Sequence, residues 1–534
     1  MPTPREPAPR GFLATLREFP ATFWVANVME LFERAAYYGL NAVLGRYLTD
    51  AVIPGDPARS GLGFSADEAG FLQSIVYAAT YIVPILGGAL ADRYGYRRML
   101  LFAFSLLSAG YFASGHVSSW GAIFATLLLM AVGSGLFKPI ISGTIARTTT
   151  ERNSGFGFGI YYWMINLGAL VAPMIVIWLR GMSWRYVFLA SSAYCAAMLV
   201  PTIFVYRDPP RPRSTKGIGE VLRGAALVLS DARFMLMVIV YSCFWILYFQ
   251  NFGTVLWYLR DFVDPGPADA FLASLGLPVH FDAEFVTMIN AGTIVLLQIA
   301  ISSLVRRFRP LPTMVGGIVL GSAGFFCLAF SRNVWVFALG IAIFSIGEMT
   351  AHPKYYSYVG LVAPRDRKAV YMGYAFLYGV IGSLVGSNVG GELYHRYLEP
   401  VVGQAGVDRT LTGFWATFGI LGVVAAGALV AYDRLFGADT PATRRRARLV
   451  LIAFYVVLLL LAVKFIHYGL GLPAAKKAKV MVQSLIMLGI GGGGLLVLLT
   501  HRHRENPGPG RPAGGKAGAA GSPGRGSSPG PGPA

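Results

Sequence analysis

Long apolar runs, separated by short polar stretches, recur along almost the whole of the 534-residue chain. Many of these runs reach the roughly 20 residues that an α-helix needs to cross a bilayer. We expect fourteen spanning helices, near residues 22–48, 67–91, 98–116, 120–145, 156–179, 185–206, 235–260, 284–305, 313–331, 334–362, 368–394, 411–433, 448–470 and 479–500. The pattern therefore predicts an all-α polytopic membrane protein.

The longest polar connection among the first twelve predicted helices is rich in Pro and Arg and divides them into six plus six. We expect a cytoplasmic tail at 1–20, six-helix bundles at 21–206 and 235–435, a cytoplasmic linker at 207–234, two additional helices within 436–503, and a disordered Gly/Pro-rich tail at 504–534. Twelve helices in two halves are typical of the major facilitator fold, in which substrate binds near the midplane between the halves.

Composition agrees with the pattern, since 55% of residues are hydrophobic and only 13% are charged. The formal net charge of +19 comes from Lys and Arg that collect in alternate loops. Cytoplasmic loops carry such an excess, so we expect both termini in the cytoplasm, in a bacterial inner (plasma) membrane, and no nucleic-acid partner. The loop with Lys476, Lys477 and Lys479 breaks this alternation, because its predicted position is on the outer face.

The first predicted helix carries charge inside its apolar run. Residues 30–39 read Glu-Leu-Phe-Glu-Arg-Ala-Ala-Tyr-Tyr-Gly. A charged side chain at the centre of a lipid-facing helix costs ~2.5–3.5 kcal/mol on insertion scales. At about 100° per residue, Glu30, Glu33, Arg34, Tyr37 and Tyr38 lie within an arc of roughly 140°. This face is therefore either a functional site or a structural ion-pair knot that fixes helix packing.

A second charged motif lies between the second and third predicted helices. It reads Gly-Ala-Leu-Ala-Asp-Arg-Tyr-Gly-Tyr-Arg-Arg from Gly88 to Arg98 and resembles the signature of the major facilitator superfamily. An Asp beside arginines at a helix end can pair with a neighbouring helix and break that pairing on movement. Asp92 and Arg93 are therefore candidate gating residues. The alternative is a simple positively charged loop.

The face at residues 30–39 resembles the ExxERFxYYG signature of the proton-dependent oligopeptide transporter family, also called the peptide transporter family. Ala35 stands in place of the Phe. Three further stretches resemble family motifs in the same order: Gly133 to Pro139, Tyr161 to Gly168, and Ile346 to Glu348 followed by Pro353. The resemblance covers residues 20–435.

The resemblance implies symport of di- or tripeptides with protons by alternating access, driven by the proton gradient without a cofactor. A zwitterionic peptide needs a cation for its carboxylate and an anion for its amine. Candidate substrate-binding residues are Arg34, Tyr37, Tyr38, Tyr81, Lys138, Asn166, Asn290 and Glu348. Arg34 and Lys138 would bind the carboxylate and Glu348 the amine. The tyrosines and Asn290 have the plain alternative of core packing or a bond to a neighbouring helix.

Candidate proton-coupling residues are Glu30, Glu33, Glu348 and His352. Glu30 and Glu33 are like charges beside Arg34, so their titrations should be coupled. His352 lies four residues after Glu348, and we hypothesise that the two share proton handling. The alternative is that His352 only hydrogen-bonds a helix carbonyl. A pairing of Lys138 with Glu348 across the halves would close the inner side as a gate.

Two positions depart from the family pattern. Phe249 replaces an acid of the seventh span, and Asn41 replaces an Arg that follows the Tyr-Tyr-Gly. In the family these two groups are thought to form the outer gate as an ion pair. Losing one partner would strand a buried charge at ~3–5 kcal/mol, whereas replacing both is nearly neutral. We therefore expect the outer gate to close by other means. The stretch Tyr374-Ala375-Phe376 also departs from the family's aromatic pattern.

Two rival functions remain open at this point. The first keeps the fold but changes the cargo to another amino-acid-derived solute, or makes the protein a drug/proton antiporter. The second is a peptide sensor that does not transport, although the sequence contains no output domain. An enzyme is not expected, since no nucleophile–base set, metal cluster or phosphate loop is found. We expect a monomer.

Overall fold

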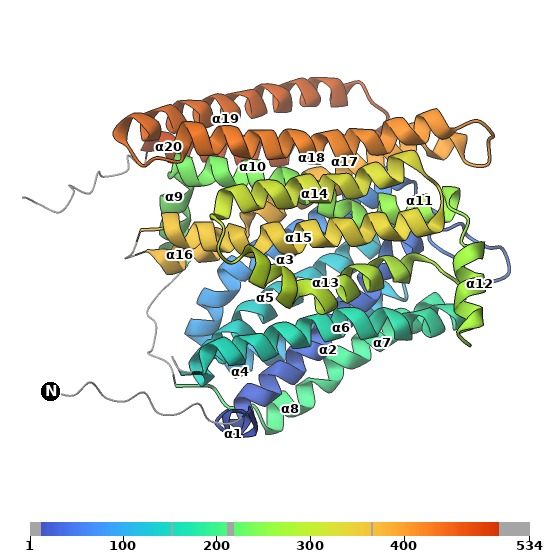
Figure 1. The fold of residues 1–534 in the computed structure, drawn as a ribbon, viewed down its shortest axis with the longest axis horizontal. Helices are drawn as coiled ribbons and strands as arrows, with labels where there is room; N and C mark the ends of the chain where they lie inside the picture. Colours follow the sequence, from blue (N-terminus) through green and yellow to red (C-terminus); the bar gives the residue numbers. More distant parts are fainter. Residues whose placement is uncertain (1–11, 151–152, 211–217, 365–366, 501–534) are drawn as a thin grey trace, which may run out of the picture.

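The computed structural model describes residues 12–150, 153–210, 218–364 and 367–500, and the regular elements in these ranges are helices (Figure 1). The expected tail at 504–534 lies outside the described residues. The N-terminal bundle consists of α2 (Ala21–Thr49), α3 (Ala66–Tyr94), α4 (Tyr96–Ser114), α5 (Trp120–Thr148), α6 (Ser154–Met182), α7 (Trp184–Ala197) and α8 (Leu199–Phe204). A short helix, α1 (Phe12–Arg17), precedes it.

The C-terminal bundle begins with α10 (Ala232–Tyr248), which continues through η1 (Phe249–Phe252) into α11 (Thr254–Phe262). Its other long helices are α13 (Ala283–Val305), α14 (Pro310–Phe330), α15 (Val334–Val362), α17 (Leu377–Tyr397), which the short α16 (Lys368–Tyr374) precedes, and α18 (Asp408–Phe436). Short connecting helices are α9 (Ile218–Leu229), α12 (Gly266–Ser274) and η2 (Glu399–Val401). The additional hairpin is α19 (Pro441–Leu470) and α20 (Ala474–Thr500).

Each of the fourteen predicted spans coincides with a helix or a run of consecutive helices. Among the described residues, 12 helices are long and apolar enough to cross a membrane. The helices α2 and α4 are not among them. Helix α2 carries Glu30, Glu33, Arg34 and Arg46, and α4 begins with two arginines. The all-α fold with two six-helix halves and two extra C-terminal helices is thus confirmed, and the chain is an integral multi-pass membrane protein.

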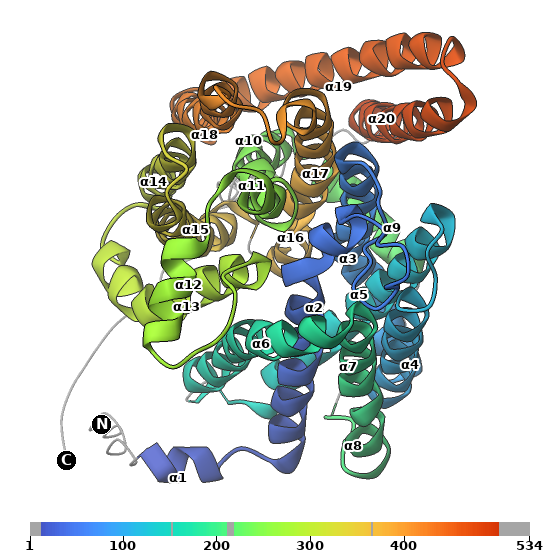
Figure 2. The same ribbon diagram turned by 90° about the vertical axis from the view of Figure 1, so that its right-hand side faces the viewer.

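The two halves meet mainly along two pairs of helices, α3 with α17 and α6 with α13 (Figure 2), and α2 also contacts α13 and α11. We call the end with the α2–α3 connection the outer end, following the charge pattern, and the opposite end the inner end. Near the outer end, α3 and α17 touch through their backbones. A Cβ atom on Gly391 would lie 2.4 Å from the Ala66 carbonyl oxygen and 3.0 Å from the Gly70 Cα. Small residues allow such close approach between membrane helices.

The linker between the halves contains a helix that the sequence analysis missed. Helix α9 lies within the expected linker 207–234 and contacts α3, α10, α16 and α20. Its apolar residues recur at helical spacing, a signal that was available in the sequence. The linker is therefore part of the packed inner end, and residues 211–217 lie outside the described ranges.

We predict that Gly391→Ala separates or destabilises the α3–α17 crossing. The added methyl group would overlap the Ala66 carbonyl, and overpacking typically costs ~1–3 kcal/mol. Thermal unfolding of the purified protein measures the effect. Gly413→Ala on α18 is the matched control, because no atom lies within 4 Å of its added Cβ. Equal melting temperatures for both variants would contradict the assigned crossing.

Candidate functional site

A cavity of about 1300 Å³ lies between the two halves. Its wall includes Glu30, Arg34 and Lys138 from the N-terminal half and Glu348 from the C-terminal half. The wall also includes Asp92 and Glu220, which lie at the inner ends of α3 and the linker helix α9. The cavity therefore extends from the middle of the bundle towards the inner end.

The charged side chains of α2 point two ways, some towards the cavity and one towards α5. Arg34 Nε donates to Glu33 Oε2 at 2.6 Å and lies 3.5 Å from Glu30 Oε1. Glu33 is fully buried, and its Oε1 accepts a hydrogen bond of 2.8 Å from Ser134 on α5. Glu30 and Arg34 line the cavity, whereas Glu33 is not among the lining residues. Glu33 thus fixes Arg34 against α5.

Aromatic rings surround the two cations of the N-terminal wall. The Arg34 guanidinium carbon lies 4.8 Å from the centre of the Tyr37 ring and 5.8 Å from that of Tyr38. The Lys138 ammonium lies 5.8 Å from the Tyr37 ring centre and 5.4 Å from that of Tyr81. Tyr38 and Tyr81 line the cavity, and Tyr37 is not among the lining residues. Tyr37 therefore supports both cations from behind the wall.

The opposite wall presents a carboxylate. Glu348 Oε2 accepts a hydrogen bond of 3.1 Å from Asn290, whose amide also donates to Ser345 Oγ at 2.8 Å. Within the described chain, Glu348 and Lys138 have no ion-pair partner within 4 Å. The expected ion pair between them is therefore not formed in this conformation, and their role as a gate stays a prediction. Asn166 also lines the cavity, while its amide donates to the Tyr162 carbonyl at 2.8 Å.

His352 lies in the same wall, but its hydrogen-bond partner is Tyr241 and not Glu348. Its Nδ1 is 3.2 Å from the Tyr241 hydroxyl oxygen. The rings of Trp245 and Tyr356 lie 5.0 Å and 5.1 Å from it, centre to centre. Among the described residues, His352 makes no hydrogen bond to a helix carbonyl, which was the alternative expected for it. Shared proton handling with Glu348 stays a prediction.

Several aromatic lining residues were not identified from the sequence. They are Phe158, Tyr161, Tyr162, Trp245, Tyr248, Phe252, Tyr356, Tyr374, Phe376 and Tyr378. Phe376 lies in the short turn between α16 and α17, in the stretch that departs from the family pattern. Aromatic residues are common throughout this chain, so composition alone could not distinguish those of the cavity from those of the core.

The positions that depart from the family pattern meet each other through Tyr77. The Tyr77 hydroxyl donates to Asn41 Oδ1 at 3.3 Å, and its ring stacks on Phe249 with centres 5.5 Å apart. Asn41 and Phe249 are both buried. A neutral hydrogen bond and a ring stack therefore join the two positions at which the family resemblance implies an ion pair.

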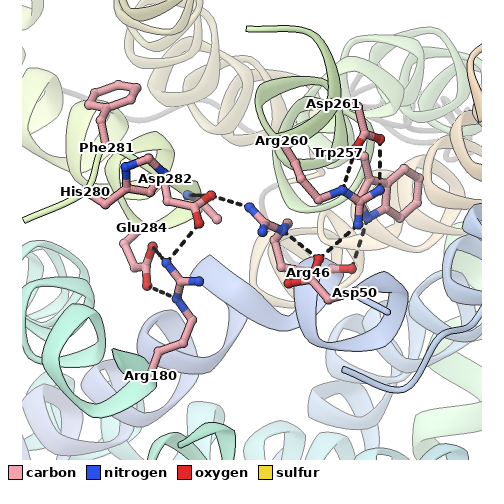
Figure 3. Close-up of polar contacts among 12 residues, drawn as sticks. Arg46, Asp50, Arg180, Trp257, Arg260, Asp261, His280, Phe281, Asp282 and Glu284 are labelled. Atoms are coloured by element: carbon pink, nitrogen blue, oxygen red, sulfur yellow. Dashed lines mark hydrogen bonds and ion pairs between the residues drawn. The ribbon is translucent and has the colours of Figure 1, made fainter. Parts of the chain in front are cut away.

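The outer end is closed by a network of ion pairs that joins the halves (Figure 3). Arg46 of α2 pairs with Asp50 at 2.8 Å and with Asp282, which caps α13. Arg180 at the end of α6 reaches the same Asp282 at 2.9 Å and Glu284 at 2.6 Å. One carboxylate thus holds two arginines of the other half.

A second arm of this network extends to α11 and α17. Arg260 pairs with Asp50 at 2.9 Å and with Asp261 at 2.6 Å, and the Tyr394 hydroxyl donates to Asp261 at 2.8 Å. The Trp257 indole donates to the Gly45 carbonyl at 3.0 Å. This network was not predicted from the sequence, because ion pairs between residues far apart in the chain leave no local sequence pattern.

The inner end carries the major facilitator motif. Asp92 Oδ1 lies 3.8 Å from Arg147 Nη2 on α5 and 3.4 Å from the Tyr96 hydroxyl. Arg93 is exposed, with its guanidinium carbon 5.4 Å from the Tyr94 ring centre. The motif Asp therefore pairs with a neighbouring helix, as its position predicted.

We predict that Asp282→Asn weakens the outer closure and lowers the melting temperature. Arg46 and Arg180 would keep Asp50 and Glu284, so the expected cost is ~1–3 kcal/mol. Asp56→Asn is the control, since the Asp56 side chain is 41% exposed and lies 4.0 Å from Arg59, whose side chain is 69% exposed. A melting temperature no lower than that of the control would contradict the role of Asp282.

The difference in melting temperature between the native protein and Asp282→Asn should depend on pH. Burial alone would raise the pKa of Asp282, but Arg46 and Arg180 outweigh it and hold that pKa below its usual range. A carboxyl with a lowered folded-state pKa stabilises the fold at neutral pH, and this stabilisation is lost as pH falls through that pKa. Melting curves of the native protein and the variant should therefore converge on acidification.

Comparison with known proteins agrees with this architecture. Residues 36–387 match the model of the Major Facilitator Superfamily. A crystal structure of a POT family transporter in complex with 5-aminolevulinic acid has a TM-score of 0.61 and 20% identity, covering 79% of this chain and 99% of that one. A nucleoside transporter, NupG (D323A mutant), has a TM-score of 0.63 and 17% identity over 77% of this chain and 99% of that one.

Sequence relatives include transporters of several names. A di-/tripeptide transporter of Lactococcus lactis is 34% identical over 171 residues, 32% of each chain. The uncharacterized transporter YclF of Bacillus subtilis is 31% identical over 219 residues, 38% of this chain and 43% of that protein. The multidrug resistance protein MdtH of Aeromonas hydrophila is 23% identical over 385 residues, 69% of this chain and 87% of that protein.

The match spans less than half the length of the first two of these relatives. The resemblance to the oligopeptide transporter family is nonetheless confirmed, because both the sequence relatives and the structural neighbours include peptide or POT family transporters. These relatives are transporters by name, in agreement with the expectation that the chain is not an enzyme. With well over half of its residues matched by the family model, the chain belongs to the Major Facilitator Superfamily.

Proposed function

We propose that this protein is a secondary active transporter that carries di- and tripeptides together with protons by alternating access. The observation that carries the proposal is the charge arrangement of the cavity. Arg34 and Lys138 lie on one wall, and Glu348, without an ion-pair partner in the described chain, lies on the facing wall. A zwitterionic peptide would satisfy both walls at once, with its carboxylate at the cations and its amine at Glu348.

The size and lining of the cavity support a small peptide. A volume of about 1300 Å³ exceeds the ~300–1,000 Å³ of typical small-molecule sites, so a di- or tripeptide fits with water. Asn166 and Asn290 would bind the peptide amide, and the tyrosines would contact side chains without demanding a particular one. The named di-/tripeptide transporter among the relatives favours this substrate class.

The conformation fits one state of an alternating-access cycle. The ion pairs of Arg46, Arg180 and Arg260 close the outer end, while the cavity reaches the inner end. Opening to the outside would break these pairs and bring Lys138 and Glu348 together as the inner gate. In this proposal the protein is a monomer in a bacterial plasma membrane, with both termini in the cytoplasm.

Proton coupling would involve Glu30 and Glu348. Both line the cavity, and Glu30 Oε2 has no hydrogen-bond partner in the described part of the chain. A carboxylate released from its cation by an arriving substrate takes up a proton more readily. Substrate binding at Arg34 would therefore favour protonation of Glu30. The driving force is the proton gradient, and no cofactor is needed.

We predict that the purified protein in liposomes takes up labelled dialanine under an imposed pH gradient. An uncoupler should abolish accumulation, because the gradient supplies the energy. Glu348→Gln should reduce uptake at least tenfold, since an amide cannot pair with the peptide amine; a lost charge-assisted bond is worth ~1.5–3 kcal/mol. Gly413→Ala, far from the cavity wall, is the control.

Other outcomes would redirect the proposal. No uptake for a panel of di- and tripeptides would remove the peptide substrate. Uptake insensitive to the uncoupler would keep the substrate and remove the coupling. The resemblance to MdtH over 69% of the chain favours drug/proton antiport as the second candidate. Proton release driven by a cationic drug, with no peptide uptake, would support antiport instead.

We predict that His352→Ala shifts the pH dependence of uptake if His352 shares proton handling with Glu348. Dialanine uptake measured from pH 4 to pH 8 would report this, because removing a group that exchanges protons changes the pH profile. Tyr241→Phe removes the hydroxyl that bonds the ring but keeps the packing, and serves as the matched variant. An unchanged pH profile for His352→Ala would contradict the hypothesis.

A further inference from the structure

The added hairpin α19–α20 touches both halves of the transporter at the outer end. Lys479, near the start of α20, lies 2.8 Å from Asp67 Oδ2 and 3.1 Å from Glu392 Oε2. Its ammonium also donates to the Asp67 carbonyl at 3.3 Å. Asp67 belongs to α3 of the N-terminal half, whereas Glu392 belongs to α17 of the C-terminal half. One cation thus bridges the line where the halves meet.

Apart from a contact between α20 and the linker helix α9, the rest of the hairpin is attached to the C-terminal half. Helix α19 contacts α10 and α18, and the Gln483 amide donates to Asn388 on α17 at 3.0 Å. Figure 2 shows the hairpin running along the outside of the bundle, with α20 near α3 and α17. The hairpin would therefore move with the C-terminal half, and Lys479 would lose Asp67 if the halves separated at the outer end.

Because of where Lys479 lies, separation of the halves at the outer end would break its contact with Asp67. Its two partners flank the Gly70–Gly391 crossing, where α3 and α17 touch through their backbones. Lys479 and Asp67 are mostly buried, with side chains 15% and 16% exposed. A partly buried pair contributes more than a surface pair, because water screens it less.

We propose that the α19–α20 hairpin is a conformational strap, in which Lys479 holds α3 to α17 only while the outer end is closed. The strap biases the transporter towards the conformation with the cavity open to the inner end. It also accounts for one of the three lysines that break the charge alternation, since Lys479 meets acidic partners at the outer end. The inference rests on the proposed alternating-access function.

Other contacts across the same line remain when Lys479 is changed. Glu399 accepts a hydrogen bond of 2.8 Å from the Ala66 amide, at the start of α3. His395 lies 3.8 Å from Asp67 and 2.5 Å from Glu399. A variant at Lys479 should therefore still fold and close, but with a shifted balance between the two conformations.

We test the strap with a pair of spin labels across the outer opening in the full chain. The labels are placed at Arg59→Cys and Gln404→Cys, exposed positions in the outer loops of the two halves, after Cys195, Cys243 and Cys327 are replaced by Ala. Pulsed electron–electron double resonance then measures the distribution of distances between the two labels in liposomes. Lys479→Gln should raise the population with the longer distance roughly threefold to tenfold.

Lys476→Gln is the matched control, because it removes the same charge from an exposed position of the same helix. Lys479→Arg should keep the native distribution. If Lys479→Gln does not fold, Asp67→Asn removes the same pair and is measured in its place. An unchanged distribution in the folded variant, or an equal change in Lys476→Gln, overturns the proposal. The measurement needs no substrate, so failure of peptide uptake would not affect it.

Discussion

Each ionised group inside a membrane-spanning bundle must find a counter-charge, a hydrogen-bond partner or water, because lipid offers none of these. Helix α2 shows how the structure satisfies this requirement. Glu33 is satisfied by Arg34 and by Ser134 of α5, so it ties the helix to its neighbour. Glu30 and Arg34 instead face the cavity, where a substrate or water can complete their contacts.

The two ends of the bundle meet the same constraint differently. At the outer end, acidic and basic side chains from both halves pair directly, and Asp282 serves two arginines at once. At the cavity, Lys138 and Glu348 lie on facing walls, and their charges are stabilised by aromatic rings and an amide. This asymmetry is what gives the transporter one closed end and one reachable site in the same conformation.

The amino-acid sequence predicted the spans well, because apolar length and helical periodicity are local properties. It also placed Glu30 and Arg34 on one face, since that requires only 3.6 residues per turn. It could not predict that Glu33 and Tyr37 turn away from the cavity, because the directions depend on where α5 packs. The pair Arg46–Asp282 spans 236 residues of sequence and depends on the docking of the two halves.

The neutral contact at Tyr77 has an electrical consequence. Moving one elementary charge across a membrane potential changes its energy by ~2.3 kcal/mol per 100 mV. Asn41, Tyr77 and Phe249 carry no charge, so their separation transfers none through the field. In the proposed cycle, any voltage sensitivity would therefore come from charged groups elsewhere, from protons and from the substrate. A separation of these three side chains would add none.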